Sequence, residues 1–468
     1  MSSRKVVVIG AGPAGYVCAI RLAQLGQKVT VVEKDQLGGT CLNVGCIPSK
    51  AMIAAGALMD RVRHASTMGL TVKDMELDVE KLVSWKAGIV KKLTGGIGIL
   101  LGKHGVEHVV GEARLQDRST VVVKGQGGET RLSCDDIVIA TGSVPSGVPG
   151  FEIDGTRVWS SMEALAPEEV PGHLVVIGGG YIGLELGFLY SKLGSKVTVV
   201  EFTEGALPGQ DRDCVKIIER SLKKRKIKLL TKTAAKGYEA AKDKLFVKVE
   251  KRDGGDTDTI ECDQILCTVG RRPFSEGLGL EHVGLEVDGR GFLPTDQRMR
   301  TSVPNIYAIG DIAGQPMLAH KGSKEGLVAA GVIAGEAEEY DALCVPAVIF
   351  TSPEMASVGL QEAEAREQGH DVVVGQFPFA ASGRAMSLME TDGFVKIVSD
   401  AKTDLVLGVH MVGPEVTELI AEAAMAIELG ATSEDIARTI HAHPTLPEAM
   451  MEAAEAVHGM AVHIYQKK

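Results

Sequence analysis

Two cysteines five residues apart, Cys41 and Cys46, carry the strongest chemical signal in this sequence, and Lys50 follows the second by four residues. On a straight α-helix the Cα atoms of residues five apart lie roughly 8–9 Å from each other, whereas a disulfide tolerates only about 4.4–6.8 Å. A bridge would therefore need an irregular turn, for which Gly45 provides backbone freedom. Strained bridges are the reducible kind. The alternative is two unpaired thiols in a buried loop, and the residues around the pair favour the redox interpretation.

A strand–turn–helix–strand pattern occurs twice, and the second copy begins 168 residues after the first. The first copy covers 6–33 and the second starts at Leu174. Six residues are identical in register, four of them glycines: Gly10, Gly12, Gly15, Gly26, Lys28 and Glu33 match Gly178, Gly180, Gly183, Gly194, Lys196 and Glu201. This agreement is hard to attribute to chance, so we expect two related domains.

Each glycine of the motif has a physical task in binding a dinucleotide. The first forms the tight turn, the second lets a pyrophosphate approach the backbone, and the third lets the helix pack on the strand. The helix N-terminus then faces the phosphates with its free N–H groups. Glu33 and Glu201 end the second strand of their copies, where a carboxylate accepts from ribose hydroxyls. One copy alone could be an ordinary tight turn, but two copies with terminal acids predict two dinucleotide sites.

The second acid also bears on the choice of nicotinamide cofactor. A carboxylate at Glu201 accepts from a ribose 2′-hydroxyl but repels a 2′-phosphate. The following residues, 202–207, contain no arginine that could receive such a phosphate. The sequence therefore favours NAD over NADP.

Composition excludes several other classes of protein. The net charge of −11 argues against a nucleic-acid binder. The sequence contains no run of 18 apolar residues, so we expect no membrane span. Eight cysteines scattered over 468 residues do not form a disulfide framework, and zinc-site spacing is absent. Residues 1–5 lead directly into the first strand, so we expect no signal or transit peptide and a cytoplasmic location.

These features together resemble the pyridine nucleotide–disulfide oxidoreductase family, and most closely its dihydrolipoamide dehydrogenases, over essentially the whole chain. The segments that carry the resemblance are the redox motif at 38–50, the turn at 140–143, the return segment at 269–273, the second flavin motif at 306–311, the flavin-lining segment at 317–320 and the acid–base motif at 441–448.

The resemblance implies two cofactors, FAD and NAD, and no metal. The expected FAD contacts are Gly10, Gly12, Gly15, Glu33, Lys34, Gly39, Thr40, Lys50, Ala113, Thr141, Gly142, Ser143, Asp311, Met317, Leu318, Ala319 and His320. The expected NAD contacts are Gly178, Gly180, Tyr181, Gly183, Glu185, Glu201 and Gly270. Asp311 would hold a ribityl hydroxyl, Lys50 would lie near the flavin ring with Glu185 as its ion partner, and Tyr181 would cover the nicotinamide unless it is a packing aromatic.

The resemblance also assigns the catalytic roles. Cys41 would exchange with the substrate sulfur, and Cys46 would face the flavin as a thiolate, the reactive form of the side chain. A base is still needed, and His443 is the candidate because it titrates near neutral pH. Glu448 would orient its imidazole, as in a Ser–His–Asp triad. A structural histidine before a proline is the alternative for His443, and His441 is better explained as structural or secondary.

The elements that must position these residues predict an α/β fold with two Rossmann-like domains and an α+β dimerisation domain. We expect an FAD-binding domain at 1–149 with a β insertion, a Pro/Gly linker at 144–150, and an NAD-binding domain at 150–270 with a basic helix at 216–228. A central region at 271–345 would complete the FAD side, and 346–468 would form the dimerisation domain, with helices at 415–429 and 433–440. In this family the base comes from the partner subunit, so we expect an obligate homodimer.

The predicted reaction is oxidation of protein-bound dihydrolipoamide by NAD⁺ through a Cys41–Cys46 disulfide and FAD. The expected partners are lipoyl domains of an acyltransferase (E2) or the glycine cleavage H protein. Two alternatives remain open: a reductase of another disulfide or of a quinone, and a non-catalytic flavoprotein that serves as an assembly subunit.

Overall fold

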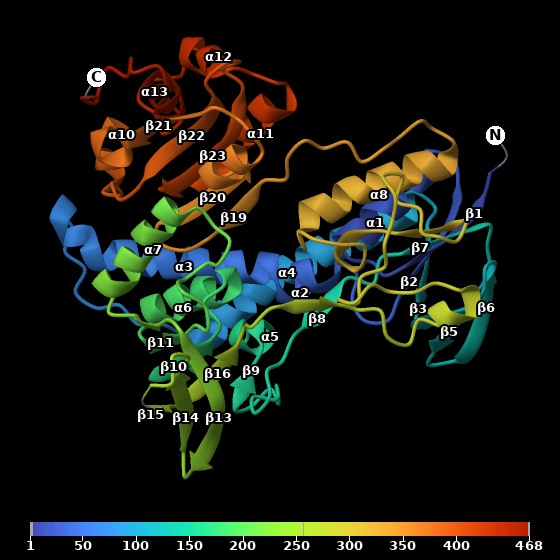
Figure 1. The fold of residues 1–468 in the computed structure, drawn as a ribbon. Helices are drawn as coiled ribbons and strands as arrows, with labels where there is room; N and C mark the ends of the chain where they lie inside the picture. Colours follow the sequence, from blue (N-terminus) through green and yellow to red (C-terminus); the bar gives the residue numbers. More distant parts are fainter. Residues whose placement is uncertain (1–2, 256, 467–468) are drawn as a thin grey trace. The chain divides into compact units, whose positions relative to one another are not determined.

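The computed structural model describes residues 3–255 and 257–466, and its contacts divide the chain into two compact units (Figure 1). The first comprises the residues up to Val148 together with Trp159–Glu169 and Val269–Asp341. The second comprises Pro149–Val158, Val170–Thr268 and the residues from Ala342 onward. Both units are therefore assembled from segments far apart in the sequence.

The first unit is built on a five-stranded sheet in the order β18-β7-β1-β2-β3. Its strands are β1 (Lys5–Ile9), β2 (Lys28–Glu33), β3 (Glu107–Val110), β7 (Asp136–Ile139) and β18 (Ile306–Ala308), and all pairs are parallel. Val6 and Val8 belong to the core on one face, and Val7 and Ile9 to the core on the other. A parallel sheet buried on both faces explains why β1 reads as a continuous apolar run.

Helices and a small sheet cover this central sheet. Helix α1 (Pro13–Gln24) packs along α8 (Ala319–Ala334), and α4 (Val79–Lys103) joins the same core. The antiparallel sheet β4 (Glu112–Asp117), β5 (Thr120–Gly125) and β6 (Gly128–Ser133) forms the predicted β insertion. The beginning of the predicted linker is a strand, since β8 (Ser143–Pro145) pairs antiparallel with β17 (Arg271–Pro273).

The two cysteines lie on either side of a helix break. Helix α2 (Gly39–Val44) ends at Gly45, and α3 (Cys46–His64) begins directly after it. The expected irregular turn is thus confirmed. A side chain at position 45 would place its Cβ 2.9 Å from the Thr40 carbonyl oxygen, so only glycine fits between the two helices.

One stretch of the described residues, Gly39–Met68, is long and apolar enough to cross a membrane by length and composition alone. That test is also passed by helices of soluble proteins, and this stretch is interrupted at Gly45 between the two cysteines. It is weak support for a membrane span.

The second unit contains a similar five-stranded sheet in the order β12-β11-β10-β16-β9. Its strands are β9 (Val158–Trp159), β10 (His173–Ile177), β11 (Lys196–Val200), β12 (Lys228–Leu230) and β16 (Gln264–Cys267). Helices α6 (Tyr181–Leu193) and α7 (Arg212–Lys224) follow β10 and β11, and β13 (Thr233–Ala241), β14 (Lys244–Lys251) and β15 (Thr257–Cys262) form an antiparallel sheet. The predicted basic helix at 216–228 is wrong at its C-terminal end, because α7 ends at Lys224 and Lys228 already pairs with Thr198 in the sheet.

The C-terminal part of this unit is an antiparallel sheet with helices packed on it (Figure 1). The strand order is β19 (Ala347–Ile349), β20 (Glu354–Gly359), β23 (Val406–Gly413), β22 (Phe394–Asp400) and β21 (Val372–Pro378). Helices α11 (Val416–Glu428), α12 (Ser433–Arg438) and α13 (Glu448–Val457) pack against it. The predicted helices at 415–429 and 433–440 are confirmed within two residues at each end.

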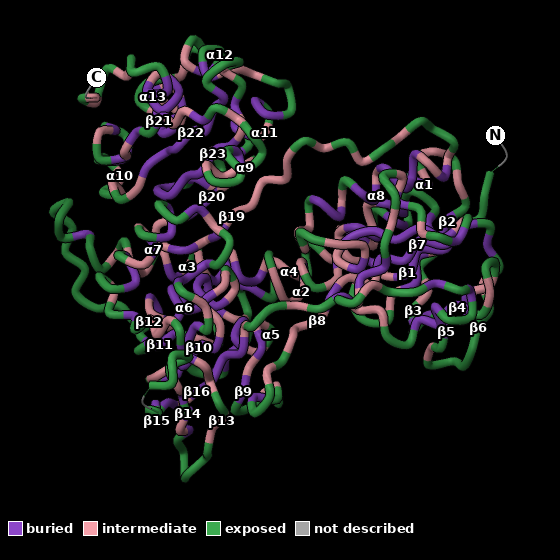
Figure 2. Tube along the Cα trace, viewed as in Figure 1, coloured by how far each residue is buried: buried purple, intermediate pink, exposed green. Residues whose placement is uncertain are grey.

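Short helices complete the description: α5 (Ser161–Ala164), α9 (Glu362–Glu367), α10 (Gly383–Leu388), η1 (Ala65–Met68), η2 (Leu280–Val283), η3 (Gly310–Ile312) and η4 (Phe379–Ala381). Figure 2 shows that burial concentrates in the strands of the large sheets, while loops and outer helix faces are exposed. The mixed α/β class predicted from the sequence is confirmed.

Candidate active site

The first glycine loop connects β1 to α1 with the geometry of a phosphate site. Gly10 has a φ of +102°, which a side chain rarely adopts. A Cβ at Gly15 would lie 2.0 Å from the Gly10 carbonyl oxygen, so the helix can approach the turn only without a side chain there. Gly12 precedes α1 without any side-chain cap, which leaves the first N–H groups of the helix free for an anion.

The second loop repeats this geometry between β10 and α6. Gly178 has a φ of +103°, and a Cβ at Gly183 would lie 2.1 Å from the Gly178 carbonyl oxygen. Gly180 precedes α6, again without a side-chain cap. The repeat read from the sequence is therefore also a repeat of backbone structure.

The terminal acids hold their glycine loops in the same way in both copies. Glu33 accepts the backbone N–H of Ala11 at 2.8 Å and that of Asp35 at 2.9 Å. Glu201 accepts the N–H of Gly179 at 2.6 Å and that of Thr203 at 2.6 Å. Carboxylate oxygens have two lone pairs each, so both acids can still accept a ribose hydroxyl.

A close backbone contact adds to the first loop. A Cβ at Gly39 would lie 2.7 Å from the Cα of Gly12, so the start of α2 touches the start of α1. Asn43 holds this arrangement by donating its side-chain amide to the carbonyls of Leu37 and Gly39. The side chain of Thr40 is exposed at this point. Such a cradle without side chains fits a pyrophosphate, as the predicted FAD contacts require.

Cys41 and Cys46 are two thiols in this structure, which is the reduced form of the predicted redox pair. The pKa of Cys41 is raised by its hydrogen bond with Cys46 and by burial, while the positive charge of Lys50 acts in the opposite direction. The two sulfurs and the Lys50 ammonium therefore act on one another, as expected for a dithiol beside a cation. The other cysteines are buried, except for the half-buried Cys344.

Residues of two predicted FAD segments, 140–143 and 306–311, meet the return segment 269–273 where β8 pairs with β17. Ser143 donates its hydroxyl to Asp311 at 2.5 Å, and Arg271 donates to the Ser143 hydroxyl and carbonyl at 2.8 and 2.7 Å. Thr141 donates to the Phe274 carbonyl at 2.7 Å, next to Gly142 in a left-handed conformation. The ammonium of Lys34 lies 4.0 Å from the centre of the Phe274 ring.

A buried ion pair on α8 supports the second flavin motif, and the sequence analysis missed it. Glu325 accepts the N–H of Gly310 at 2.7 Å and pairs with Lys321 at 2.7 Å. Lys321 also donates to the Gly314 carbonyl at 2.9 Å. Burial raises the pKa of Glu325. Only the i, i+4 spacing of a lysine and a glutamate could have indicated this pair, and that spacing is common on exposed helices.

The remaining predicted FAD residues lie on two further elements. Ala113 is buried on β4. Met317 and Leu318 precede α8, and Ala319 and His320 form its first turn, where no side chain caps the helix.

His443 and Glu448 form the predicted pair. His443 Nδ1 lies 2.8 Å from Glu448 Oε1, and Glu448 Oε2 accepts the N–H of Thr445 at 2.7 Å. Burial acts to raise the pKa of Glu448, but the Thr445 N–H and His443 outweigh it and hold that pKa below its usual value. The His443 side chain is 81% exposed, so its imidazole is both oriented and accessible.

His441 lies in a different environment. Its side chain is only 5% exposed, and its ring nitrogens contact the Thr439 carbonyl at 2.8 Å and Glu422 at 2.9 Å. These contacts favour the structural role expected for it.

The remaining predicted NAD contacts are Tyr181 and Glu185 on α6 and the distant Gly270. Tyr181 begins α6 and is partly exposed, and Gly270 has a φ of +129°. Glu185 is buried on α6 and accepts the N–H of Phe350 at 2.9 Å. Its ion pair with Lys50 stays a prediction.

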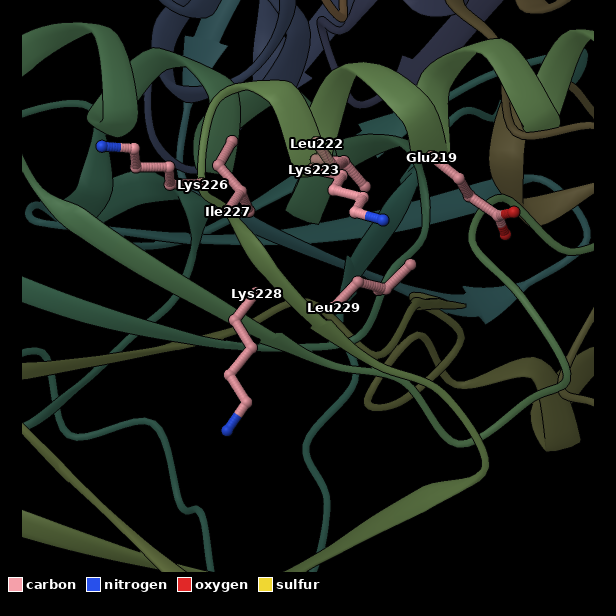
Figure 3. A pocket seen from close by; sticks show the side chains of 7 residues that line it. All are labelled: Glu219, Leu222, Lys223, Lys226, Ile227, Lys228 and Leu229. Atoms are coloured by element: carbon pink, nitrogen blue, oxygen red, sulfur yellow. The ribbon is translucent and has the colours of Figure 1, made fainter.

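A pocket lies between the end of α7 and β12, and none of the residues that line it is a predicted site residue (Figure 3). Glu219, Lys223, Lys226 and Lys228 line it. Figure 3 shows the lysine side chains pointing in different directions, so they form no convergent anion site. Within the described residues, no cluster of three or more His, Cys, Asp or Glu side chains could hold a metal ion.

Comparison with known proteins agrees with this geometry. Residues 4–326 match the model of the pyridine nucleotide-disulphide oxidoreductases, and 345–454 match the dimerisation domain of the same family. The chain therefore belongs to the pyridine nucleotide-disulphide oxidoreductase family.

Similar curated proteins are dihydrolipoyl dehydrogenases. The chain is 49% identical to that of Geobacillus stearothermophilus over 99% of this chain and 98% of the relative, and 49% identical to that of Thermus scotoductus over the full length of both. Among solved structures, LpdA from Mycobacterium tuberculosis is similar with a TM-score of 0.90 and 29% identity, covering 96% of this chain and 99% of that one. The flavoprotein disulfide reductase RclA from Escherichia coli is similar with a TM-score of 0.85 and 28% identity, covering 95% and 98%.

The chain is thus an oxidoreductase of the flavoprotein disulfide reductase type that uses FAD and NAD. It carries the dimerisation domain of its family, which supports a homodimer. The two glycine loops and their acids fit these two dinucleotides.

Proposed function

We propose that the chain catalyses the dihydrolipoyl dehydrogenase reaction, in which dihydrolipoamide is oxidised to lipoamide and NAD⁺ is reduced to NADH. The observation that carries this proposal is the pair of interacting thiols at the α2–α3 break, beside the Lys50 charge. The accessible His443–Glu448 pair supplies the proton acceptor that a dithiol substrate needs.

The cysteines would carry out the thiol–disulfide exchange. In the oxidised enzyme, a substrate thiolate attacks the Cys41 sulfur, the Cys41–Cys46 bond breaks, and Cys46 leaves as a thiolate. The second substrate thiol then attacks the sulfur bound to Cys41, which forms the lipoamide disulfide and releases Cys41. The raised pKa of Cys41 would favour its protonation once it is released, and the thiolate role of Cys46 is the one that the family resemblance implies. Bound FAD supplies the route by which the two electrons reach NAD⁺.

His443 would take the proton of each substrate thiol at Nε2. Its Nδ1 faces Glu448, so Glu448 fixes the ring orientation and stabilises the charged imidazole. As in the family, the partner subunit's His443 would serve Cys41, which makes the homodimer the working unit. Lys50 would stand beside the flavin, and the contacts inferred from the sequence would hold the two cofactors.

The natural substrates would be lipoyl domains of an acyltransferase or of the glycine cleavage H protein. The enzyme would work in the cytoplasm, where thiols stay reduced. Both assignments rest on the proposed reaction.

Steady-state assays test the proposal. Purified enzyme should reduce NAD⁺ with dihydrolipoamide and use NADP⁺ at least about a hundredfold less efficiently, because Glu201 repels a 2′-phosphate. Anaerobic titration with dihydrolipoamide should produce a long-wavelength thiolate–flavin band, which Cys46→Ser should abolish while Cys344→Ser keeps it. Turnover restricted to another disulfide or a quinone would favour the reductase alternative. An unchanged spectrum in Cys46→Ser would favour a non-catalytic flavoprotein.

A further inference from the structure

The residues after Glu201 contain no arginine, but the fold brings one to them from fifty positions away. The guanidinium carbon of Arg252 lies 4.6 Å from the centre of the Phe202 ring, and its Nη1 donates to the Phe202 carbonyl at 3.2 Å. Phe202 directly follows Glu201 at the end of β11. The arginine therefore lies beside the acid that is expected to face the ribose.

Backbone hydrogen bonds fix this neighbourhood. The N–H of Arg252 donates to the Lys232 carbonyl at 2.8 Å, and the N–H of Lys232 donates to the Thr203 carbonyl at 2.8 Å. The N–H of Thr233 donates to the Glu201 carbonyl at 3.0 Å. Arg252 is thus connected to the strand end that carries Glu201 through ordered backbone rather than through a long side chain alone.

The two cationic side chains near Glu201 differ in whether they form an ion pair. Lys232 pairs with Glu204 at 2.7 Å. Within the part of the chain that the structure describes, no carboxylate lies within ion-pair distance of Arg252, and the Phe202 ring on which it stacks is 57% exposed. An uncommitted guanidinium is the group best suited to bind a phosphate with two hydrogen bonds.

We propose that Arg252 is a specificity-determining residue that forms a latent 2′-phosphate site beside Glu201. With Glu201 charged, its repulsion keeps a 2′-phosphate out and the stacking on Phe202 holds the guanidinium. Without that charge, the Arg252 guanidinium binds the 2′-phosphate by donating hydrogen bonds to its oxygens. This inference rests on the NAD role proposed for Glu201, and it makes the charge of Glu201 the main barrier to NADP, since the nearby Glu204 is paired with Lys232.

Binding of two nucleotides that lack nicotinamide tests the proposal without relying on turnover. Calorimetry on the FAD-loaded homodimer would compare 5′-AMP with adenosine 2′,5′-bisphosphate. The affinity of the Glu201→Gln variant for the bisphosphate should be at least about tenfold higher than that of the wild type. The reason is that a charge-assisted hydrogen bond from Arg252 to the 2′-phosphate replaces the repulsion by Glu201. Adding Arg252→Gln should abolish this gain. If the glutamine variant does not fold, Glu201→Ser is the second variant. Serine also removes the carboxylate charge, and its side chain is small.

Arg290→Gln is the matched control, because Arg290 also stacks on an aromatic ring, that of Phe292 at 5.3 Å, in the other unit. It should leave the affinity of the Glu201→Gln variant for the bisphosphate unchanged. The proposal is overturned if removing the Glu201 charge gives no gain, or if the gain persists without Arg252. A wild type that binds neither nucleotide would instead refute the NAD role of Glu201.

Discussion

At the scale of single residues, the general base proposed for this chain must satisfy two opposed demands. The base must be exposed so that it can meet a substrate thiol. It must also be oriented by a partner side chain that is itself covered from solvent. His443 and Glu448 divide these demands, because the imidazole is largely exposed whereas the carboxylate is mostly covered and also accepts the Thr445 N–H. The sequence spacing of five residues predicted the pair, and the structure confirms their contact.

Glu448→Gln should lower dihydrolipoamide turnover at pH 8 by about a hundredfold, because the charged imidazole loses its carboxylate. The pKa of Glu448 is depressed in the folded chain, so its contribution to stability is present above its ordinary pKa and is lost as the pH falls through the lowered value. The difference in Tm between variant and wild type should therefore shrink in strong acid.

Thermal unfolding as a function of pH and steady-state kinetics would measure both effects. Glu434→Gln is the control, since Glu434 lies on the α12 surface in an exposed pair with Arg438. Equal losses of turnover in both variants would contradict a specific role of Glu448.

At the scale of elements, a buried lysine joins α7 to the antiparallel sheet of the second unit. Lys396 on β22 is almost completely buried, and its ammonium pairs with Asp211 at 2.5 Å and Asp213 at 3.0 Å. Asp211 also caps α7 by accepting the N–H groups of Asp213 and Cys214. Burial acts to raise the pKa of Asp211, but the bond to Lys396 outweighs it and the pKa falls below its usual value.

Lys396→Met should destabilise the protein by about 3–5 kcal/mol at pH 7, because it leaves the Asp211 charge buried without its partner. Adding Asp211→Asn should recover part of this loss, since asparagine still caps the helix and carries no charge. Urea unfolding would measure the free energy of unfolding of these two variants and of Asp211→Asn alone, which together with the wild type form a double-mutant cycle. A double variant no more stable than Lys396→Met would contradict the pairing. The wild-type pair should persist between the lowered pKa of Asp211 and the raised pKa of Lys396, because it needs both the carboxylate and the ammonium.

At the scale of the whole molecule, the C-terminal part of the chain has large apolar side chains that are exposed to solvent in the single chain. Ile440 is 97% exposed and Tyr465 is 89% exposed, and Met425, Leu429 and Val462 are also exposed. Apolar surface of this kind marks a contact with another chain. The family's dimerisation domain covers most of this region, so a second copy is the expected partner.

Ile440→Asp should dissociate the homodimer and lower dihydrolipoamide turnover by more than about a hundredfold, because the partner's His443 would then be lost. Reduction of the flavin by NADH should persist in the monomer, since that half-reaction does not need His443. Sedimentation would measure the oligomeric state, and rapid-mixing kinetics would measure the reduction of the flavin by NADH. Met162→Asp, at an exposed apolar position in the other unit, should stay dimeric. A monomer with full turnover would disprove the shared site.

Features that depend on the spacing of neighbouring residues could be predicted from the amino-acid sequence. The cysteine pair, the helix break at Gly45, the two glycine loops and the His443–Glu448 pair are fixed by residue types a few positions apart, so periodicity and turn chemistry predict them. The C-terminal end of α7 was misjudged, because a run of lysines is compatible with a helix, whereas pairing with β11 decides where the strand begins.

Contacts between segments far apart in the sequence could be found only in the folded chain. Arg252 reaches Phe202, Lys396 reaches Asp211, and Glu325 reaches Gly310 because sheets and helices bring them together across 15 to 185 positions. No local pattern encodes such pairs, since burial and charge compensation depend on the packed core. The cysteine pair and the acid at Glu201 could thus be predicted from the sequence, whereas the position of Arg252 and the buried ion pairs of Lys396 and Glu325 could not.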